Sequence, residues 1–564
     1  MHTRFTSVPR VAYFSMEIAL RADMPTYAGG LGVLAGDTVR TAADLELPLV
    51  AVTLVSRDGY FRQRLSEQGE QIEAPQHWEP RDWAVPLDAR VCLELDARPV
   101  WVAAWLYVER NPQGREVPVI LLDTDVQDNA AEDRGITQWL YGGDTRYRLK
   151  QEAVLGIGGV RILAALGFRV LQYHLNEGHS ALLALELLRR CEIPERDRHA
   201  GETRYDLPRV RELCSFTTHT PVEAGHDHFP YTLVRAVLGE FIDQSLLESL
   251  GGQPELNLTR LALSTSECVN GVTQRHAETS RRQFPGVDVH AISNGVHVTT
   301  WVCAEIAPLL DQHVPRWRQE PEFLVRADCC VPPQALWSAH AAARQRLFAQ
   351  LAQATGVRFD PALPLLGFAR RMTQYKRPEL LFHDLARLRA IAKRQPFQLV
   401  VAGKAHPQDA AGRELVKTVI ANLRVLAPEI RGVYLADYDL ASAQTLVSGV
   451  DLWLNTPLPP LEASGTSGMK AALNGVPSLS VLDGWWLEGC IEGVTGWAIG
   501  NGDAQGADAD AASLYGKLED TVLPLYRNDT AGWIRVMLGA MAKNGSIFNS
   551  HRMMRRYATE AYLR

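Results

Sequence analysis

The chain has 564 residues, which is more than one hydrophobic core supports and indicates two large domains. Its 46% hydrophobic and 22% charged residues are typical of a globular protein. The formal net charge of −7 provides no long-range attraction to nucleic acid or to anionic membranes, and no apolar run reaches the length of a membrane span, so neither is expected as a partner.

The eight cysteines form no CxxC pair and match no zinc spacing. We therefore expect no metal site, and free thiols fit a reducing compartment. The N-terminal segment does not predict a signal peptide, because Glu17 interrupts its apolar run. The sequence thus indicates a cytoplasmic protein that acts on a small molecule or a neutral polymer.

Strand-like and helix-like runs alternate along the first part of the chain, up to about residue 293. The strand-like runs are RVAYFS, LPLVAVTLVS, FRVLQYHLNE, RELCSFTTHT and VDVHAISN. Helix-like runs such as TVRTAADL and HSALLALELLRR lie between them. This alternation is typical of βα units, which build parallel sheets.

The alternation restarts after about residue 300, in the strand-like runs LPLLGFAR, QLVVAGK, GVYLAD, VDLWLN and VPSLSVLDG. The helix-like runs here are PELLFHDLARLRAIAKR, GRELVKTVIANLRVL and MKAALN. We therefore predict an α/β fold with two Rossmann-like domains, 1–293 and 294–545, that face a central cleft, since such sheets bind ligands at strand carboxyl ends. The basic segment 546–564 is expected to form a helix that packs back on the first domain.

A glycine-rich loop, EASGTSGMKAALNG (462–475), places Lys470 where a loop after one strand becomes a helix. Free N–H groups and the positive end of a helix dipole favour phosphate at such a point. A flexible loop with an exposed lysine remains the alternative for this segment alone.

A second glycine-rich loop is YAGGLGVLAGD (27–37), in which Gly30, Gly32 and Ala35 match a dinucleotide-binding spacing. That fingerprint begins directly after a strand, whereas here about a dozen residues intervene. Close approach of the backbone to a phosphate or a sugar fits better. The alternative is a tight turn before a helix.

A cluster of cations occurs in FARRMTQYKRPEL (368–380), where Arg370, Arg371, Lys376 and Arg377 follow a predicted strand. A solvated surface is the alternative, because most charge runs are exposed. The carboxyl end of this strand would, however, face the same cleft as Lys470, which favours an anion site.

Polar side chains end the predicted strands of the first half: Glu177 and His179 in HLNEGH, His219 in THT and Asn294 in SNG. Such groups could form hydrogen bonds to a sugar, although a buried structural histidine is the more common case. Trp485 and Trp486 follow another strand, and for them packing in the core is favoured over stacking on a ligand.

Together these motifs resemble the α-glucan phosphorylases, the family of glycogen, starch and maltodextrin phosphorylases, in a short bacterial form. EASGTSGMKAALNG followed by VLDG is similar to that family's pyridoxal-phosphate motif. Further family motifs occur in the family's order: YFSME, GGLG, RLKQE, HLNEGH, THT, SNG, RRMTQYKR and AGKA. The resemblance is weak over about 60–140 and 225–265. It implies the GT-B glycosyltransferase architecture.

By this resemblance, Lys470 would hold pyridoxal 5′-phosphate covalently, and Arg371 and Lys376 would bind the phosphates as catalytic residues. Further cofactor contacts would come from Arg370, Thr466 and Ser467. Substrate contacts would come from the backbone of Gly30 and Gly32 and from Glu177, His179, His219, Asn294, Glu462, Ser464 and Gly465.

The implied reaction is reversible phosphorolysis of the non-reducing end of an α-1,4-glucan or maltodextrin by inorganic phosphate, which gives α-glucose 1-phosphate with retention. The cofactor phosphate would act as general acid and base. Two phosphate dianions ~5 Å apart repel by roughly 13 kcal/mol at an effective dielectric of ~20, so several cations and N–H groups are needed beside them.

Two other functions stay open. A nucleotide-sugar-dependent glucan synthase would share the architecture, but many such enzymes carry a second glutamate eight positions after the first, where this chain has Lys470 after Glu462. A non-catalytic glucan-binding protein is the other alternative. A glycosidase would need two carboxylates across the bond, and Glu177 has no evident partner. A homodimer is also left open.

Overall fold

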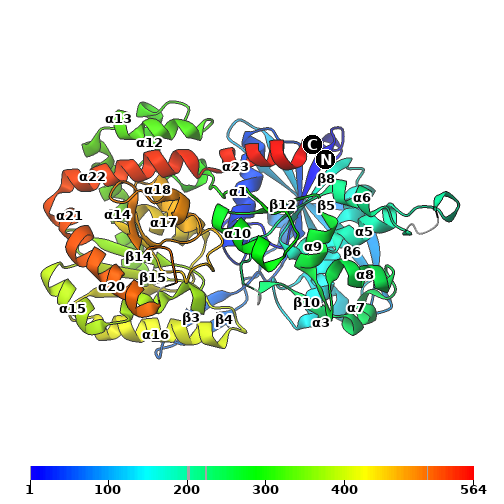
Figure 1. The fold of residues 1–564 in the computed structure, drawn as a ribbon, viewed down its shortest axis with the longest axis horizontal. Helices are drawn as coiled ribbons and strands as arrows, with labels where there is room; N and C mark the ends of the chain where they lie inside the picture. The colour runs from blue at the N-terminus through cyan, green and yellow to red at the C-terminus, as the bar shows by residue number, and fades with distance from the viewer. Residues whose placement is uncertain (1, 200–202, 223–224, 505, 564) are drawn as a thin grey trace.

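The structure is a computed structural model that describes residues 2–199, 203–222, 225–504 and 506–563. It contains a nine-stranded sheet and a six-stranded sheet, each with helices around it, which lie side by side along the long axis of the molecule (Figure 1). The prediction of an α/β fold with parallel sheets is confirmed. We call residues 2–293 the first half and residues 294–549 the second half.

The first sheet has the strand order β13-β12-β9-β8-β1-β2-β7-β6-β5. The strands from β13 to β7 are parallel, and within them the order β7-β2-β1-β8-β9-β12 is that of a doubly wound fold. The strands are β1 (Arg10–Ser15), β2 (Leu49–Leu54), β5 (Val85–Leu95), β6 (Arg98–Arg110), β7 (Glu116–Asp123), β8 (Val170–Asn176), β9 (Cys214–Thr217), β12 (Cys268–Gly271) and β13 (His290–Ala291).

The antiparallel edge β5-β6-β7 was not predicted from the sequence. Asp96 and Ala97 join β5 to β6, with φ angles of 54° and 56°. Two successive positive φ angles are the conformation of a tight hairpin turn, which normally carries Asn-Gly or Asp-Gly. The turn lacks glycine, so the usual signal for a hairpin is missing.

The second sheet is parallel throughout, in the order β16-β15-β14-β17-β18-β19. This is again the doubly wound order, in which the order of the strands along the sheet reverses between the parallel neighbours β14 and β17. The strands are β14 (Leu365–Ala369), β15 (Gln398–Ala402), β16 (Arg431–Leu435), β17 (Leu452–Asn455), β18 (Ser478–Val481) and β19 (Gly496–Ile499).

Helices pack around both sheets and close the two main hydrophobic cores. In the first half the longer ones are α1 (Gly30–Asp44), α3 (Thr145–Ala153), α5 (Leu183–Arg190), α7 (Tyr231–Leu238), α8 (Gln244–Gly251), α9 (Leu258–Thr265) and α10 (Gln274–Gln283). In the second half they are α14 (Pro333–Thr355), α15 (Leu385–Arg394), α16 (Ala410–Leu426), α17 (Leu440–Gly449), α18 (Thr466–Leu473), α20 (Ala507–Lys517) and α22 (Thr530–Gly539).

The predicted helix over PELLFHDLARLRAIAKR is wrong in one respect, because the structure divides it. A short 3-10 helix, Pro378–Phe382, comes first, and α15 begins after Asp384. The Asp384 carboxylate accepts a hydrogen bond from the backbone N–H of Arg387, so it caps α15 and ends the preceding turn.

The last residues lie against the first half, although they follow the second (Figure 1). Helix α23 (Ser550–Tyr557) packs on α1. The Tyr557 hydroxyl lies 3.1 Å from Thr217 Oγ1 and accepts a hydrogen bond from Asn270 Nδ2 at 3.0 Å. Buried hydrogen bonds of this kind fix the segment to the sheet of the first half.

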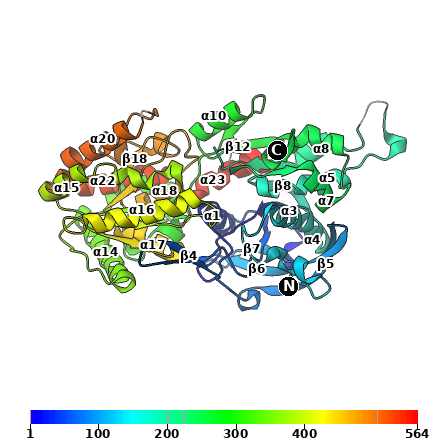
Figure 2. The ribbon, with the colours of Figure 1, turned by 90° about the horizontal axis from the view of Figure 1, so that it is seen from below.

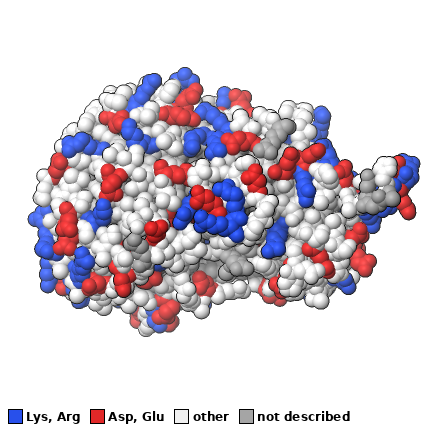
Figure 3. All heavy atoms as spheres, in the orientation of Figure 1, with Lys and Arg blue, Asp and Glu red and all other residues white. Residues whose placement is uncertain are grey.

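Within the described ranges, no helix is long and apolar enough to cross a membrane, and no cluster of His, Cys, Asp or Glu side chains could hold a metal ion. Positive and negative side chains are interspersed over the face of the molecule shown in Figure 3.

Candidate functional site

The reversal of strand order in the second sheet brings two distant loops together. Arg370 and Arg371 directly follow β14, and the loop that leads to Lys470 follows the neighbouring strand β17. In parallel sheets the crevice at such a reversal is the usual ligand site. The cation cluster and the Lys470 loop therefore share one edge, as predicted from their positions after strands.

Glu462 joins the two loops through buried ion pairs. Its carboxylate lies 2.6 and 2.8 Å from Lys376 Nζ and 2.8 Å from Arg370 Nη2. Burial alone would raise the pKa of Glu462, but the charges of Arg370 and Lys376 lower it below the usual value, so the carboxylate stays ionised. Arg371 follows Arg370 directly in the chain and is not among the partners of Glu462, so these four side chains carry a formal net charge of +2 that is available to an anionic ligand.

Lys470 is not an exposed loop lysine, so that alternative reading is wrong. It lies in α18 with 7% exposure, and its amine is 4.1 Å from the centre of the Trp301 ring. Burial lowers the pKa of Lys470 to about 8, and the charge of Asp37 offsets only part of this. A buried amine that loses its proton near neutral pH can react with a carbonyl group.

The turn before α18 is shaped by glycine and holds an unsatisfied hydroxyl group. Gly465, with a φ of 89°, precedes the first helical residue, Thr466. Ser464 Oγ is buried without a hydrogen-bond partner among the described residues, whereas Ser467 Oγ accepts a hydrogen bond from Trp453 Nε1. Buried polar atoms are normally satisfied, so the Ser464 hydroxyl remains available for a hydrogen bond to a ligand or to water.

The tryptophans after β18 belong to the core, as predicted. Trp485 and Trp486 are buried, and their ring centres lie 5.1 Å apart. A Cβ atom on Gly468 would lie 2.6 Å from the Trp485 ring, so glycine in α18 makes room for this packing. The pair thereby supports the helix that carries Lys470.

Glu17 holds the glycine-rich loop of the first half, a role that the sequence analysis missed. Its Oε2 atom accepts hydrogen bonds from the backbone N–H groups of Ala28 and Gly29, and Oε1 accepts one from the Tyr141 hydroxyl. A Cβ atom on Gly32 would lie 2.6 Å from this carboxylate. The available signal was an acidic residue within an apolar run, just after β1, which we used only to argue against a signal peptide.

The glycine-rich loop leads into α1, which begins at Gly30, so Gly30 and Gly32 lie in the first turn of a helix. Backbone N–H groups at that end are available to an anion. A Cβ atom on Gly29 would lie 3.3 Å from Arg371 Nη2, so the arginine of the second half reaches this loop of the first half.

Arg371 differs from its neighbour Arg370 because it is exposed and forms no ion pair with a described residue. Desolvation by the surrounding protein would lower the pKa of Arg371, but Tyr60, Glu17 and other nearby groups raise it above its ordinary value. The guanidinium is therefore charged, exposed to solvent and not paired with a carboxylate of a described residue. These properties are expected of a side chain that binds phosphate.

His219 and Asn294 form a neutral group of hydrogen-bonding side chains. His219 Nε2 lies 2.7 Å from Asn176 Oδ1, and burial lowers the pKa of His219 to about 3. Asn294 Oδ1 is buried without a partner in the described part of the chain. Both residues line one small cavity of about 10 Å³, together with Tyr557 of α23. The structure thus brings these two predicted sugar contacts together.

Glu177 and His179 hold neighbouring loops rather than face an open space. The Glu177 carboxylate accepts hydrogen bonds from the backbone N–H groups of Gly178 and His219 and from Thr220 Oγ1. His179 Nε2 lies 3.4 Å from Asp227 Oδ2. The Glu177 carboxylate therefore fixes His219, and its effect on a sugar would pass through that residue.

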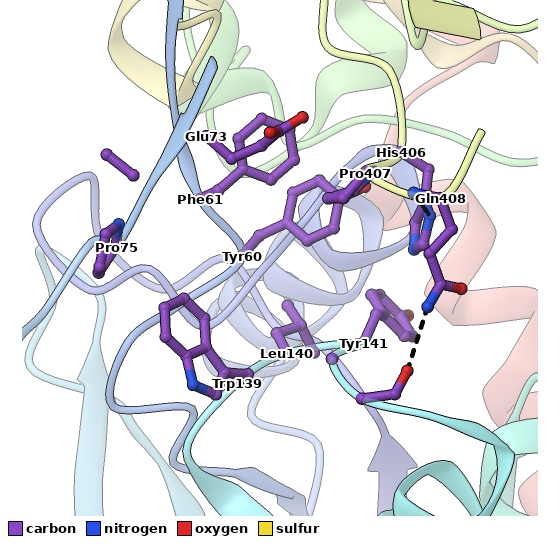
Figure 4. Close-up of a pocket in the computed structure, with 13 residues that line it drawn as sticks. Tyr60, Phe61, Glu73, Pro75, Trp139, Leu140, Tyr141, His406, Pro407 and Gln408 are labelled. Carbon is purple, nitrogen blue, oxygen red and sulfur yellow. Dashed lines mark hydrogen bonds between the residues drawn. The ribbon is translucent and has the colours of Figure 1, made fainter. Parts of the chain in front are cut away.

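An aromatic pocket of about 210 Å³ opens between the two halves (Figure 4). Its walls include Tyr60, Trp139 and Tyr141 from the first half and His406 and Gln408 from the second. Desolvation lowers the pKa of His406, and the charge of Arg371 lowers it further. This electrostatic effect shows that the pocket lies near the cation cluster. Aromatic faces with a few polar groups suit a sugar ring.

Comparison with known proteins defines the class of protein to which this geometry belongs. A family profile described as carbohydrate phosphorylase matches residues 242–492. The maltodextrin phosphorylase of Thermococcus litoralis is 37% identical, over 98% of this chain and 70% of that protein. The glycogen phosphorylase of Aquifex aeolicus is 33% identical, over 98% of this chain and 86% of that protein.

The chain belongs to the carbohydrate phosphorylase family, and the resemblance read from its motifs is confirmed. An uncharacterized protein of Methanocaldococcus jannaschii is 31% identical over 98% of this chain and 99% of its own length. A family relative of closely matching extent therefore exists beside the longer phosphorylases.

Proposed function

We propose that the protein is an α-glucan phosphorylase, which transfers the non-reducing terminal glucosyl unit of an α-1,4-glucan reversibly to inorganic phosphate, with retention. The observation that carries this is the position of a buried Lys470, whose pKa is lowered to about 8, at the same sheet edge as a net positive cluster. The two halves would act as Rossmann-like domains, 1–293 and 294–545, that face a catalytic cleft. We also propose a cytoplasmic location, and we leave assembly into a homodimer open.

The residues around Lys470 fit pyridoxal phosphate. Lys470 would hold the aldehyde carbon. Thr466 and Ser467, at the start of α18, and Arg370, directly after β14, would hold the phosphate. When bound, this cofactor supplies a second phosphate group that can exchange a proton with the substrate phosphate. The pKa of Lys470, which burial lowers to about 8, supports this assignment.

Inorganic phosphate would bind to Arg371 and to the N–H groups of Gly30 and Gly32. Arg371 keeps a free guanidinium for it, while Arg370 and Lys376 share Glu462 in the absence of a ligand. The formal charge of +2 on these four side chains would offset part of the combined charge of the inorganic phosphate and the cofactor phosphate, and backbone N–H groups would offset more of it. The arginine and the loop come from different halves, so phosphate would connect them.

The glucosyl unit would lie between two neutral groups that share one cavity, His219 and Asn294, and the turn before α18. His219 and Asn294 would bind one side of the sugar, and Glu462, Ser464 and Gly465 the other. Neutral donors and acceptors suit an uncharged ring, since they bind hydroxyl groups without placing charge beside them. The aromatic pocket would receive further glucosyl units of the chain.

The alternatives are less well supported. A glucan synthase would have a carboxylate eight positions after Glu462, where the buried Lys470 stands. A glycosidase would need a free pair of carboxylates, but Glu177 uses its oxygens on three protein hydrogen bonds. A non-catalytic glucan-binding protein gives no reason for a buried reactive lysine.

One experiment tests the proposal. The purified protein is incubated with maltodextrin and inorganic phosphate, and α-glucose 1-phosphate is measured. The protein is then reduced with borohydride, and the peptide that carries the pyridoxyl group is identified. We expect phosphate-dependent glucose 1-phosphate and a label on Lys470. Turnover only with a nucleotide sugar, or binding without turnover, would contradict it.

A further inference from the structure

A β-hairpin of the first half lies against the second half. Its strands are β3 (Arg62–Leu65) and β4 (Gln71–Ala74). Figures 1 and 2 both show it beside α16, away from the sheet of its own half. It lies outside the residues matched by the family profile and in the region where the motif resemblance is weak.

Two buried glutamines of this hairpin bind the backbone of the second half. Gln63 is 3% exposed, and its side-chain amide donates to Gly403 O at 2.9 Å and accepts from the Asp437 N–H at 3.0 Å. Gln71 is 2% exposed, and its amide donates to Ala405 O at 2.9 Å and accepts from the Ala405 N–H at 3.0 Å.

The two amides also bind each other, so every donor is used. Gln63 Nε2 donates to Gln71 Oε1 at 2.9 Å, and Gln71 Nε2 donates its second hydrogen to Glu73 at 2.8 Å. Turning either amide over would set an oxygen against a carbonyl and an NH₂ group against an N–H. The network therefore specifies one arrangement and needs glutamine at both positions.

The backbone held by this pair supports the cation cluster. Residues 403–405 run beside residues 370–372: Met372 N–H donates to Lys404 O at 3.0 Å, and Arg370 N–H donates to Ala402 O at 3.2 Å. A Cβ atom on Gly403 would lie 1.9 Å from Arg370 O, so the two segments are in direct contact. A shift of residues 403–405 would therefore move Arg371.

We propose that Gln63 and Gln71 are positioning residues, which fix the Arg370–Arg371 segment of the second half from the first half. The pair sets the distance between Arg371 and the glycine-rich loop, and so the affinity for phosphate. His406, Pro407 and Gln408 follow the clamped segment and form a wall of the aromatic pocket, which the same contact holds in place (Figure 4). This inference rests on the proposed function.

The test compares Gln63→Leu and Gln71→Leu with the control Gln68→Leu, which changes an exposed glutamine at the turn of the same hairpin. We expect each clamp variant to raise the KM for inorganic phosphate about tenfold, equivalent to 1.4 kcal/mol, with kcat at saturating phosphate lowered less than about threefold. The double variant should cost less than the product of the two, because the amides bind each other. A general loss of folded enzyme would lower kcat and leave the KM unchanged.

Amide hydrogen exchange gives a readout that does not need activity. Peptides that cover 403–405 and 370–372 should exchange faster in Gln71→Leu than in the wild type and in Gln68→Leu. The isosteric variant Gln71→Glu, which removes the donor to Ala405 O, should show the same if the leucine variants do not fold.

The outcomes separate the two proposals. If the wild type makes no glucose 1-phosphate while exchange accelerates as expected, the proposed function fails and the clamp stands. Unchanged phosphate KM together with unchanged exchange in all the clamp variants would overturn the clamp.

Discussion

The two halves of the site share a topology and differ in charge. Both parallel sheets have the doubly wound order, and both present loops at the carboxyl ends of their central strands. The second half places Arg370, Arg371, Lys376 and Glu462 there, and the charges of Arg370 and Lys376 lower the pKa of Glu462. The first half places His219 and amide groups there, and burial keeps the histidine neutral. One half is thus suited to phosphate and the other to sugar hydroxyls.

This difference follows from what surrounds each loop. In the second half, the Glu462 carboxylate is buried beside Arg370 and Lys376, whose charges lower its pKa and keep it ionised. In the first half, His174 and His219 are buried without a carboxylate partner, and burial lowers the pKa of each to about 3. The same edge of a parallel sheet can therefore form an ionic or a neutral site, depending on the groups that surround each side chain. Four experiments test this contrast between the ionic and the neutral site.

The largest effect is expected at Lys470, the centre of the ionic half. Lys470→Ala should lower phosphorolysis by at least about 10³-fold, because the cofactor loses its attachment. Absorbance of bound pyridoxal and the rate of glucose 1-phosphate formation are the measurements. Lys393→Ala, at an exposed position, is the control and should keep both. Retained activity in Lys470→Ala would contradict the assignment.

The next largest effect should come from Arg371, the free cation beside the glycine-rich loop. Arg371→Ala should lower kcat/KM for phosphate about 10²-fold or more, since one charged ligand of a developing negative charge is lost. Arg371→Lys should recover only part of this, because an ammonium group cannot bind two oxygens side by side. Arg431→Ala, on the exposed end of β16, is the matched control. If Arg371→Ala raised the KM for phosphate and the KM for maltodextrin by the same factor, the assignment of Arg371 to phosphate alone would be contradicted.

A smaller effect, on the sugar only, is expected at Asn294, which begins the second half and lines the neutral cavity together with His219 of the first half. Asn294→Ala should raise the KM for maltodextrin about tenfold, the value of one or two hydrogen bonds, with phosphate KM unchanged. Because Asn294 Oδ1 has no protein partner among the described residues, the temperature of unfolding should hardly change. A clear drop in that temperature would show that the side chain is structural.

The smallest effect is a pH dependence of stability from the buried histidines. The pKa of His174 is about 3 in the folded protein and 6.5 in the unfolded chain, so the unfolded chain binds more protons between these values. Stability from this group is present above pH 6.5 and falls as the pH drops, by at most about 1.4 kcal/mol per pH unit. Urea unfolding at about pH 7 and about pH 5 should show a smaller difference for His174→Asn than for the wild type. An equal difference would contradict neutral burial.

Much of the fold and of the site could be predicted from local patterns. Strand-to-helix alternation located most strands of both sheets, and the positions of Lys470, Arg371 and His219 after strands placed them at binding edges. The hairpin of β5 and β6 was missed because its turn has no glycine. The segment from Pro378 to Arg394 was predicted as one helix because we did not recognise Asp384 as the cap that begins α15. These errors concern turn chemistry, which weak local signals encode.

The residue types and their order along the chain determined the family, the α/β class and the loops that carry chemistry, because such signals lie within a few residues of one another. Only the tertiary structure decided which groups meet. Glu462 forms ion pairs with both Arg370 and Lys376, Glu17 holds the glycine-rich loop, and Gln63 and Gln71 bind the backbone of the second half. Ionic and hydrogen bonds act over a few ångströms in space, and distance along the sequence says little about that separation.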